Sequence, residues 1–139
     1  MTSKLVPEIV VEKEYLESAG PTYMILFTYH YNPEAPEDVK NQGITIGPGE
    51  HILLRQSVPK TGKIRKLIIN IPPGCADKVK FRLFVNQTQI FPASGWFGFE
   101  NFTQVLDFLY PVREGDKLYL EVINRGSWPH FISIAVLIE

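Results

Sequence analysis

Residues 79–85 read VKFRLFV, in which apolar and charged side chains alternate up to Phe84. Successive side chains of a β-strand point to opposite faces of a sheet, so this period of two predicts a strand with one buried face. Residues 117–122, KLYLEV, alternate in the same way, and residues 131–138, FISIAVLI, are apolar at nearly every position, which is typical of a strand covered on both faces. We therefore expect a core that contains Phe81, Leu83, Val85, Leu118, Leu120, Val122, Ile134 and Val136.

Turn residues divide the rest of the chain into short pieces, because its ten glycines and eleven prolines fall in clusters. Further strands are expected at 8–13, 22–31, 51–58, 64–71, 89–91 and 105–109. About eight or nine strands spaced by roughly 8–12 residues are typical of antiparallel sandwiches and barrels. The sequence therefore predicts an all-β fold, an antiparallel β-sandwich of jelly-roll type with about eight strands. The longest helix that we expect is a single turn around Pro36–Lys40.

The N-terminal segment departs from this regularity. Met1–Pro7 is polar and ends in a proline, with Leu5 and Val6 as isolated apolar residues, so it has little reason to be ordered on its own. We expect residues 1–14 to form an extended arm with the first strand, and residues 15–139 to form a single sandwich domain. The arm either packs on a neighbouring subunit or folds back on its own sheet.

Composition excludes several classes of protein. The chain has 139 residues, of which 45% are hydrophobic, so one core can stabilise it without metals or disulfides, and intrinsic disorder is excluded. Its 14 basic and 15 acidic residues create no field that would attract a phosphate backbone, so we expect no nucleic-acid partner. Its longest apolar runs are far shorter than the roughly 20 residues of a membrane-spanning helix, so we expect no membrane partner. The N-terminus also lacks the apolar centre of a secretory signal, which indicates synthesis in a cytoplasm.

No pattern of catalytic or metal-binding residues is visible. Cys75 is the lone cysteine, and none of the three histidines has a second ligand at metal-binding spacing. No glycine-rich phosphate loop or nucleophile elbow occurs. Glu100, Asp107 and Glu121 could act as a carboxylate pair only if the fold brought two of them together. We therefore predict a protein that is not an enzyme, with no catalytic residues, no cofactor and no metal.

Aromatic side chains give the strongest functional signal. Trp96, Phe97, Phe99 and Phe102 crowd into one loop-like segment, where they either plug one end of the sandwich or form a contact surface. Residues 128–130, Trp-Pro-His, offer a second aromatic surface that could stack on a sugar or be buried in a partner. The candidate interface residues are Leu5, Val6, Ile9, Trp96, Phe97, Phe99, Phe102, Trp128 and His130.

Three stretches together resemble a known group of proteins. They are residues 64–75 (IRKLIINIPPGC), 79–92 (VKFRLFVNQTQIFP) and 115–139 (GDKLYLEVINRGSWPHFISIAVLIE). The chain resembles the small single-domain β-sandwich proteins that are encoded among the structural genes of tailed viruses of bacteria and archaea, including capsid decoration proteins. The most specific parts are the Pro-Pro-Gly-Cys turn and the Asn124, Trp128, Pro129 and His130 that precede the final strand.

The resemblance implies a non-enzymatic virion structural protein that decorates or stabilises a capsid. Its partners would be the major capsid protein and copies of itself, most commonly in a homotrimer, and it would lie on the capsid surface after synthesis in the host cytoplasm. An alternative hypothesis is a carbohydrate-binding or receptor-binding β-sandwich module. In that case Trp96 and Trp128 would supply exposed stacking platforms.

Overall fold

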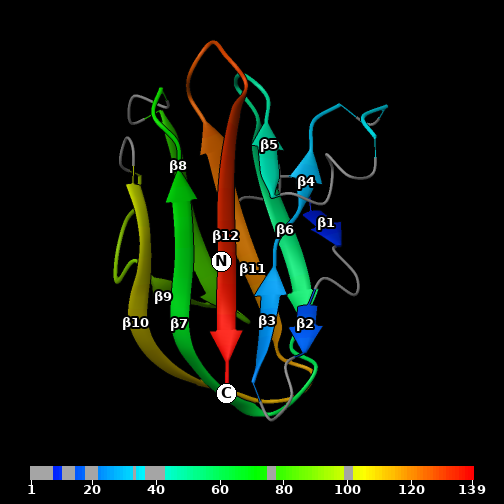
Figure 1. The fold of residues 1–139 in the computed structure, drawn as a ribbon, viewed down its shortest axis with the longest axis vertical. Helices are drawn as coiled ribbons and strands as arrows, with labels where there is room; N and C mark the ends of the chain where they lie inside the picture. The colour runs from blue at the N-terminus through cyan, green and yellow to red at the C-terminus, as the bar shows by residue number, and fades with distance from the viewer. Residues whose placement is uncertain are drawn as a thin grey trace.

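A computed structural model describes residues 8–10, 15–17, 22–32, 34–36, 43–74, 78–98 and 102–139. These residues contain strands and turns but no helix (Figure 1). The strands are β1 (Glu8–Val10), β2 (Tyr15–Glu17), β3 (Tyr23–Leu26), β4 (Tyr29–His30), β5 (Ile44–Ile46), β6 (His51–Ser57), β7 (Gly62–Ile71), β8 (Val79–Val85), β9 (Thr88–Phe91), β10 (Phe102–Val112), β11 (Lys117–Asn124) and β12 (His130–Ile138).

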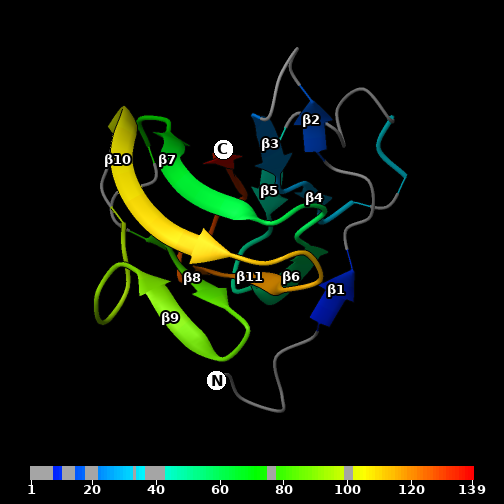
Figure 2. The ribbon, with the colours of Figure 1, turned by 90° about the horizontal axis from the view of Figure 1, so that it is seen from below.

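The strands form two sheets that pack face to face (Figure 2). The first sheet has the order β1-β6-β11-β8-β9, and the second has the order β10-β7-β12-β3-β2. Strand β5 pairs with the start of β12, and β4 pairs with β5. Without these additions and the outermost β1 and β2, two four-stranded sheets remain, β6-β11-β8-β9 and β10-β7-β12-β3. This alternation of the chain between two sheets is the double Greek key of an eight-stranded jelly roll, which confirms the predicted fold class.

The core lies between the sheets and follows the predicted strand phase. All eight of the expected core residues are buried, in positions that alternate along β8, β11 and β12. Leu120 is fully buried between Leu54 of β6 and Leu83 of β8, its cross-strand neighbours. Phe84, which interrupts the alternation in the sequence, is also buried, and it lies under the guanidinium group of Arg82.

Several strands differ from their predicted extent. The strand expected at 22–31 is divided into β3 and β4, and β5 was not expected because a strand of three residues is too short to show a period. The strand expected at 105–109 extends to residues 102–112 as β10. Pro111 fits within β10 because this is an edge strand that pairs only with β7 among the described residues, and proline is tolerated at a sheet edge.

Strand direction also differs locally from an all-antiparallel arrangement. Strand β1 runs parallel to β6, and β4 runs parallel to β5, whereas the other paired strands are antiparallel. Residues 8–10 of the expected arm thus join the edge of the first sheet, with Ile9 beside Leu54. Residues 1–7, with Leu5 and Val6, lie outside the described residues, as does most of the helical turn expected at 36–40. The described part of the chain contains no helix long and apolar enough to cross a membrane.

Candidate functional site

The loop that joins β11 to β12 is anchored by one buried side chain, that of Asn124. The two N–H groups of its Nδ2 are shared among the carbonyl oxygens of Ile46 (3.2 Å), Gly47 (3.1 Å) and Trp128 (2.8 Å). Its Oδ1 accepts a hydrogen bond from the backbone N–H of Gly126 at 2.8 Å. Asn124 is fully buried, so this amide satisfies backbone groups that water does not reach. It fixes both the start and the end of the loop.

Backbone contacts connect the start of the same loop to the residues that directly precede β8 and β6. The N–H of Arg125 donates to the carbonyl oxygen of Lys78 at 2.9 Å, and the N–H of Asn124 donates to the carbonyl oxygen of Glu50 at 2.9 Å. The Glu50 carboxylate in turn accepts from the Gly47 N–H at 2.7 Å and from the Tyr29 hydroxyl at 2.6 Å. Burial, followed by the contact with the Glu50 carboxylate, raises the pKa of Tyr29 well above its usual value, so its hydroxyl stays protonated and remains a donor.

The register of two antiparallel strands brings Lys78 and Arg125 together. Asn124, the last residue of β11, pairs with Val79, the first residue of β8, so the residues just beyond these strand ends face each other. The β11–β12 loop also lies at the same end of the sandwich as the C-terminal end of β7 (Figure 1, top). A hollow of about 300 Å³ lies between these segments, and its described lining residues are Gly74, Lys78, Arg125, Gly126, Ser127, Trp128 and His130.

Trp128 is the dominant side chain of this hollow. It is 74% exposed, more than any other large hydrophobic residue of the described chain. His130, which follows it by two residues, is half-buried and also lines the hollow. The structure therefore brings these two candidate interface residues together. The hollow's described lining has two permanent cations and no carboxylate.

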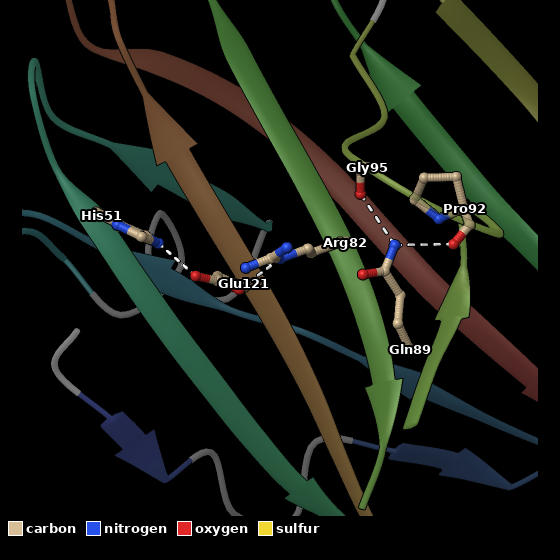
Figure 3. A network of polar contacts seen from close by, with 6 residues as sticks. All are labelled: His51, Arg82, Gln89, Pro92, Gly95 and Glu121. Carbon is tan, nitrogen blue, oxygen red and sulfur yellow. Dashed lines mark hydrogen bonds and ion pairs between the residues drawn. The ribbon is translucent and has the colours of Figure 1, made fainter. Parts of the chain in front are cut away.

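A second polar cluster lies on the outer face of the first sheet, around the buried carboxylate of Glu121 (Figure 3). Arg82 Nε donates to Glu121 Oε1 at 2.7 Å, and His51 Nε2 lies 2.5 Å from Glu121 Oε2. The guanidinium of Arg82 stacks on the ring of Trp96 at 4.2 Å. Both carboxylate oxygens of Glu121 are thus engaged, and the cluster attaches the segment around Trp96 to the sheet.

The described aromatic residues between positions 95 and 103, which are Trp96, Phe97 and Phe102, lie on different sides of the first sheet. Phe97 forms an isolated bridge with Phe81, and its ring lies 5.2 Å from those of Phe91 and Phe102, so these side chains pack against the core. Trp96, one position earlier, lies on the opposite face, where its half-buried ring contacts Arg82 and His51. Of the two alternatives for this segment, the positions of Phe97 and Phe102 fit a plug of the sandwich, because both side chains pack against the core. Phe99 lies outside the described residues.

Sequence reasoning missed two residues of the hollow, and it did not identify Asn124 as the residue that anchors the loop beside it. Lys78 and Arg125 carry no local motif, and only the register of β8 and β11 places them side by side. Asn124 has a weak signal, an asparagine at the end of a strand with a glycine two positions later. Among the residues that the structure describes, no three histidine, cysteine, aspartate or glutamate side chains are placed to hold a metal ion. That the protein binds no metal or cofactor stays a prediction.

The chain matches no protein-family model and no curated protein. Among solved structures, it is similar to a family 35 carbohydrate binding module from an environmental isolate, with a TM-score of 0.43 and 14% identity over 89% of this chain and 85% of that chain. It is also similar to a cycloisomaltooligosaccharide glucanotransferase of Paenibacillus sp. complexed with cycloisomaltoheptaose, with a TM-score of 0.36 and 12% identity over 83% of this chain and 16% of that chain. At this level of similarity, neither structure assigns a function to this chain.

Proposed function

We propose that this protein is a non-enzymatic carbohydrate-binding β-sandwich module whose binding site is the hollow at Trp128. The observation that carries the proposal is the exposure of Trp128 on a loop that the buried Asn124 holds in place. Full burial of a large apolar side chain is worth about 1.5–3 kcal/mol, and this ring forgoes most of that stabilisation in the isolated chain. An indole combines a flat apolar face with a polar edge, which suits the apolar face and the hydroxyl groups of a sugar ring.

The test is to replace Trp128 with alanine and to measure binding to a panel of neutral and acidic polysaccharides. Because aromatic anchors of binding sites contribute about 2 kcal/mol or more, we expect affinity for the bound polysaccharide to fall by about 30-fold or more. The free energy of unfolding should change by less than about 0.5 kcal/mol, since the ring makes little contact with the fold.

Leu109→Ala is the matched control. Leu109 is 65% exposed on β10, so its truncation removes a similarly exposed apolar side chain outside the hollow and should leave binding unchanged. Equal affinities of the Trp128→Ala variant and the unaltered protein for every bound polysaccharide would refute this site. No binding to any polysaccharide would refute the carbohydrate-binding function itself.

A second candidate function is that of a virion structural protein that assembles with its own copies on a capsid surface, as the sequence resemblance implies. The observation that favours it is the exposure of Val105 (57%) and Leu109 (65%) on the edge strand β10. Beside them, Lys66 Nζ lies 2.8 Å from the carboxylate of Asp107. An edge strand with apolar side chains offers a surface on which a second copy can add.

If this second function holds, the unaltered protein should be a homo-oligomer, with a trimer as the expected form. Changing Val105 and Leu109 together to serine should then produce monomers and lower the occupancy of undecorated capsids. Each substitution removes the stabilisation of about 1.5–3 kcal/mol that burial of the apolar side chain in the interface would provide. Mass in solution and capsid co-sedimentation are the measurements. Tyr31→Ser is the control, because the side chain of Tyr31 is 43% exposed and lies outside β10. A monomeric unaltered protein that binds no capsid would exclude this function.

A further inference from the structure

We infer that the ligand of the Trp128 hollow is an acidic glycan, whose sugar rings carry carboxylate or sulfate groups. This inference rests on the proposed function, because it names the chemical class of the sugar that stacks on Trp128. It follows from the kinds of hydrogen-bonding groups that the hollow offers. Lys78 and Arg125 supply positively charged donors, and the neighbouring backbone carbonyl groups are engaged by the protein itself.

The charged side chains of the hollow are donors only. A lysine ammonium group has three N–H donors, an arginine guanidinium has five, and neither accepts a hydrogen bond. Among the described residues, the side chains of Lys78 and Arg125 have no ion-pair or hydrogen-bond partner, and both residues are exposed. Arg82 differs from these two residues, because its guanidinium is already bound to the carboxylate of Glu121. The two cations of the hollow are therefore available to a ligand.

Two backbone carbonyl oxygens of residues that line the hollow already accept hydrogen bonds from other groups of the protein. The carbonyl oxygen of Trp128 accepts from Asn124 Nδ2, and the carbonyl oxygen of Lys78 accepts from the backbone N–H of Arg125. No aspartate or glutamate occurs among the described residues that line the hollow. Ser127 and His130 of the lining can each accept a hydrogen bond from a sugar hydroxyl, but the two charged side chains can only donate. Carboxylate and sulfate groups only accept, and they form the stronger charge-assisted hydrogen bonds with lysine and arginine.

A nucleic acid would also present anions and flat rings, but the observations favour a glycan. Binding to a phosphate backbone draws its affinity from several cations along an extended track. This chain has a formal net charge of -1, and its cationic lining is confined to a hollow of about 300 Å³ beside a single exposed indole. That is enough for one or two acidic sugar units. Binding of a single-stranded oligonucleotide is therefore one of the outcomes that the test must examine.

The test uses the full chain and pairs of glycans that have the same sugar backbone and differ in the number of their anionic groups. Isothermal titration calorimetry would compare oligogalacturonate with its methyl-esterified form, and chondroitin sulfate with unsulfated chondroitin, and oligothymidylate would be the nucleic-acid probe. We expect the preferred acidic glycan to bind at least tenfold more tightly than its less charged counterpart, and the two pairs distinguish a carboxylate ligand from a sulfate ligand. Affinity for the acidic glycan should fall with added salt, since ion pairs at an exposed site are screened.

Variants identify the groups that recognise the charge. Lys78→Gln and Arg125→Gln should each weaken binding to the acidic glycan by about five- to tenfold and leave binding to the less charged glycan within twofold. Lys63→Gln removes an exposed cation at the start of β7, at the opposite end of the sandwich, and should change neither affinity (Figure 1). Because all three side chains are exposed or lie outside the core, thermal unfolding should show that each variant folds.

Other results would overturn the acidic preference, the roles of the two cations or the proposed function. Equal affinity for both members of each pair, with continued dependence on Trp128, would overturn the acidic preference and leave the carbohydrate-binding function in place. An unchanged affinity for the acidic glycan in both glutamine variants would overturn the roles of Lys78 and Arg125. Tighter binding of oligothymidylate than of every glycan would overturn both the glycan class and the proposed function, as would the absence of any glycan binding.

Discussion

Replacing Asn124 with alanine should lower the free energy of unfolding by about 3 kcal/mol or more and should also abolish ligand binding in the hollow. The alanine would leave the carbonyl oxygens of Ile46, Gly47 and Trp128 and the N–H of Gly126 without the amide that now satisfies them. Each buried polar group that loses its partner costs about 1–3 kcal/mol, and water can replace the amide only on the side of the exposed loop. Chemical denaturation and calorimetric titration are the measurements.

Asn124→Asp provides a sharper version of the same experiment. The aspartate keeps the shape of the side chain and the oxygen that accepts from Gly126, but it replaces the donating NH₂ group with an oxygen that faces three carbonyl oxygens. We expect this variant to be at least as unstable as the alanine variant, because the lost donor becomes a repulsive acceptor in a buried site. If the alanine variant lost less than about 1 kcal/mol and still bound its ligand, Asn124 would not be the anchor of the loop.

Replacing Leu120 with alanine should destabilise the protein by about 2–5 kcal/mol, because the truncation loses the transfer free energy of the buried atoms and leaves a cavity. Leu120 has no exposed surface and lies in the central part of β11, between β6 and β8. The midpoint of urea unfolding should fall without a large change in the slope of the transition. Ligand binding should persist under conditions in which the variant is folded, since Leu120 does not line the hollow.

Leu109→Ala again serves as the control, now for stability. The chemical change is the same, but the side chain is 65% exposed, so its loss should cost less than about 0.5 kcal/mol. A loss of under half a kcal/mol for Leu120→Ala as well would contradict the assignment of this strand face to the core.

Alternation within single strands was enough to predict eight residues of the core, and the spacing of strands and turns predicted the class of the fold. Leu118, Leu120 and Val122 repeat with a period of two, and this local pattern requires no knowledge of the neighbouring strands. The direction of the β1–β6 pair was not predictable in the same way, because a strand of three residues carries no sign of which way it runs beside its partner. Strand β5 was missed for the related reason that three residues are too few to show a period.

The candidate site was predicted only in part. Trp128 and His130 stand close together in the sequence, and a tryptophan beside a proline is visible as a candidate surface residue. Arg125 and Lys78 are brought together only when β8 pairs with β11, so their shared surface is a property of the tertiary fold. Glu121 is a similar case, because no local pattern shows that Arg82 and His51 will occupy both of its oxygens.

The anchoring of the β11–β12 loop by a residue outside it has a consequence for how this protein can change. Asn124 belongs to β11 and bonds only to backbone atoms of the loop and of its neighbours, so the side chains of Arg125, Ser127 and Trp128 are not needed for the loop to keep its shape. Mutations at these three positions can therefore accumulate without disturbing the backbone of the loop. The architecture separates the residues under selection for folding from those under selection for recognition, and the loop is a natural position for the diversification of ligand preference, in evolution or in a designed library.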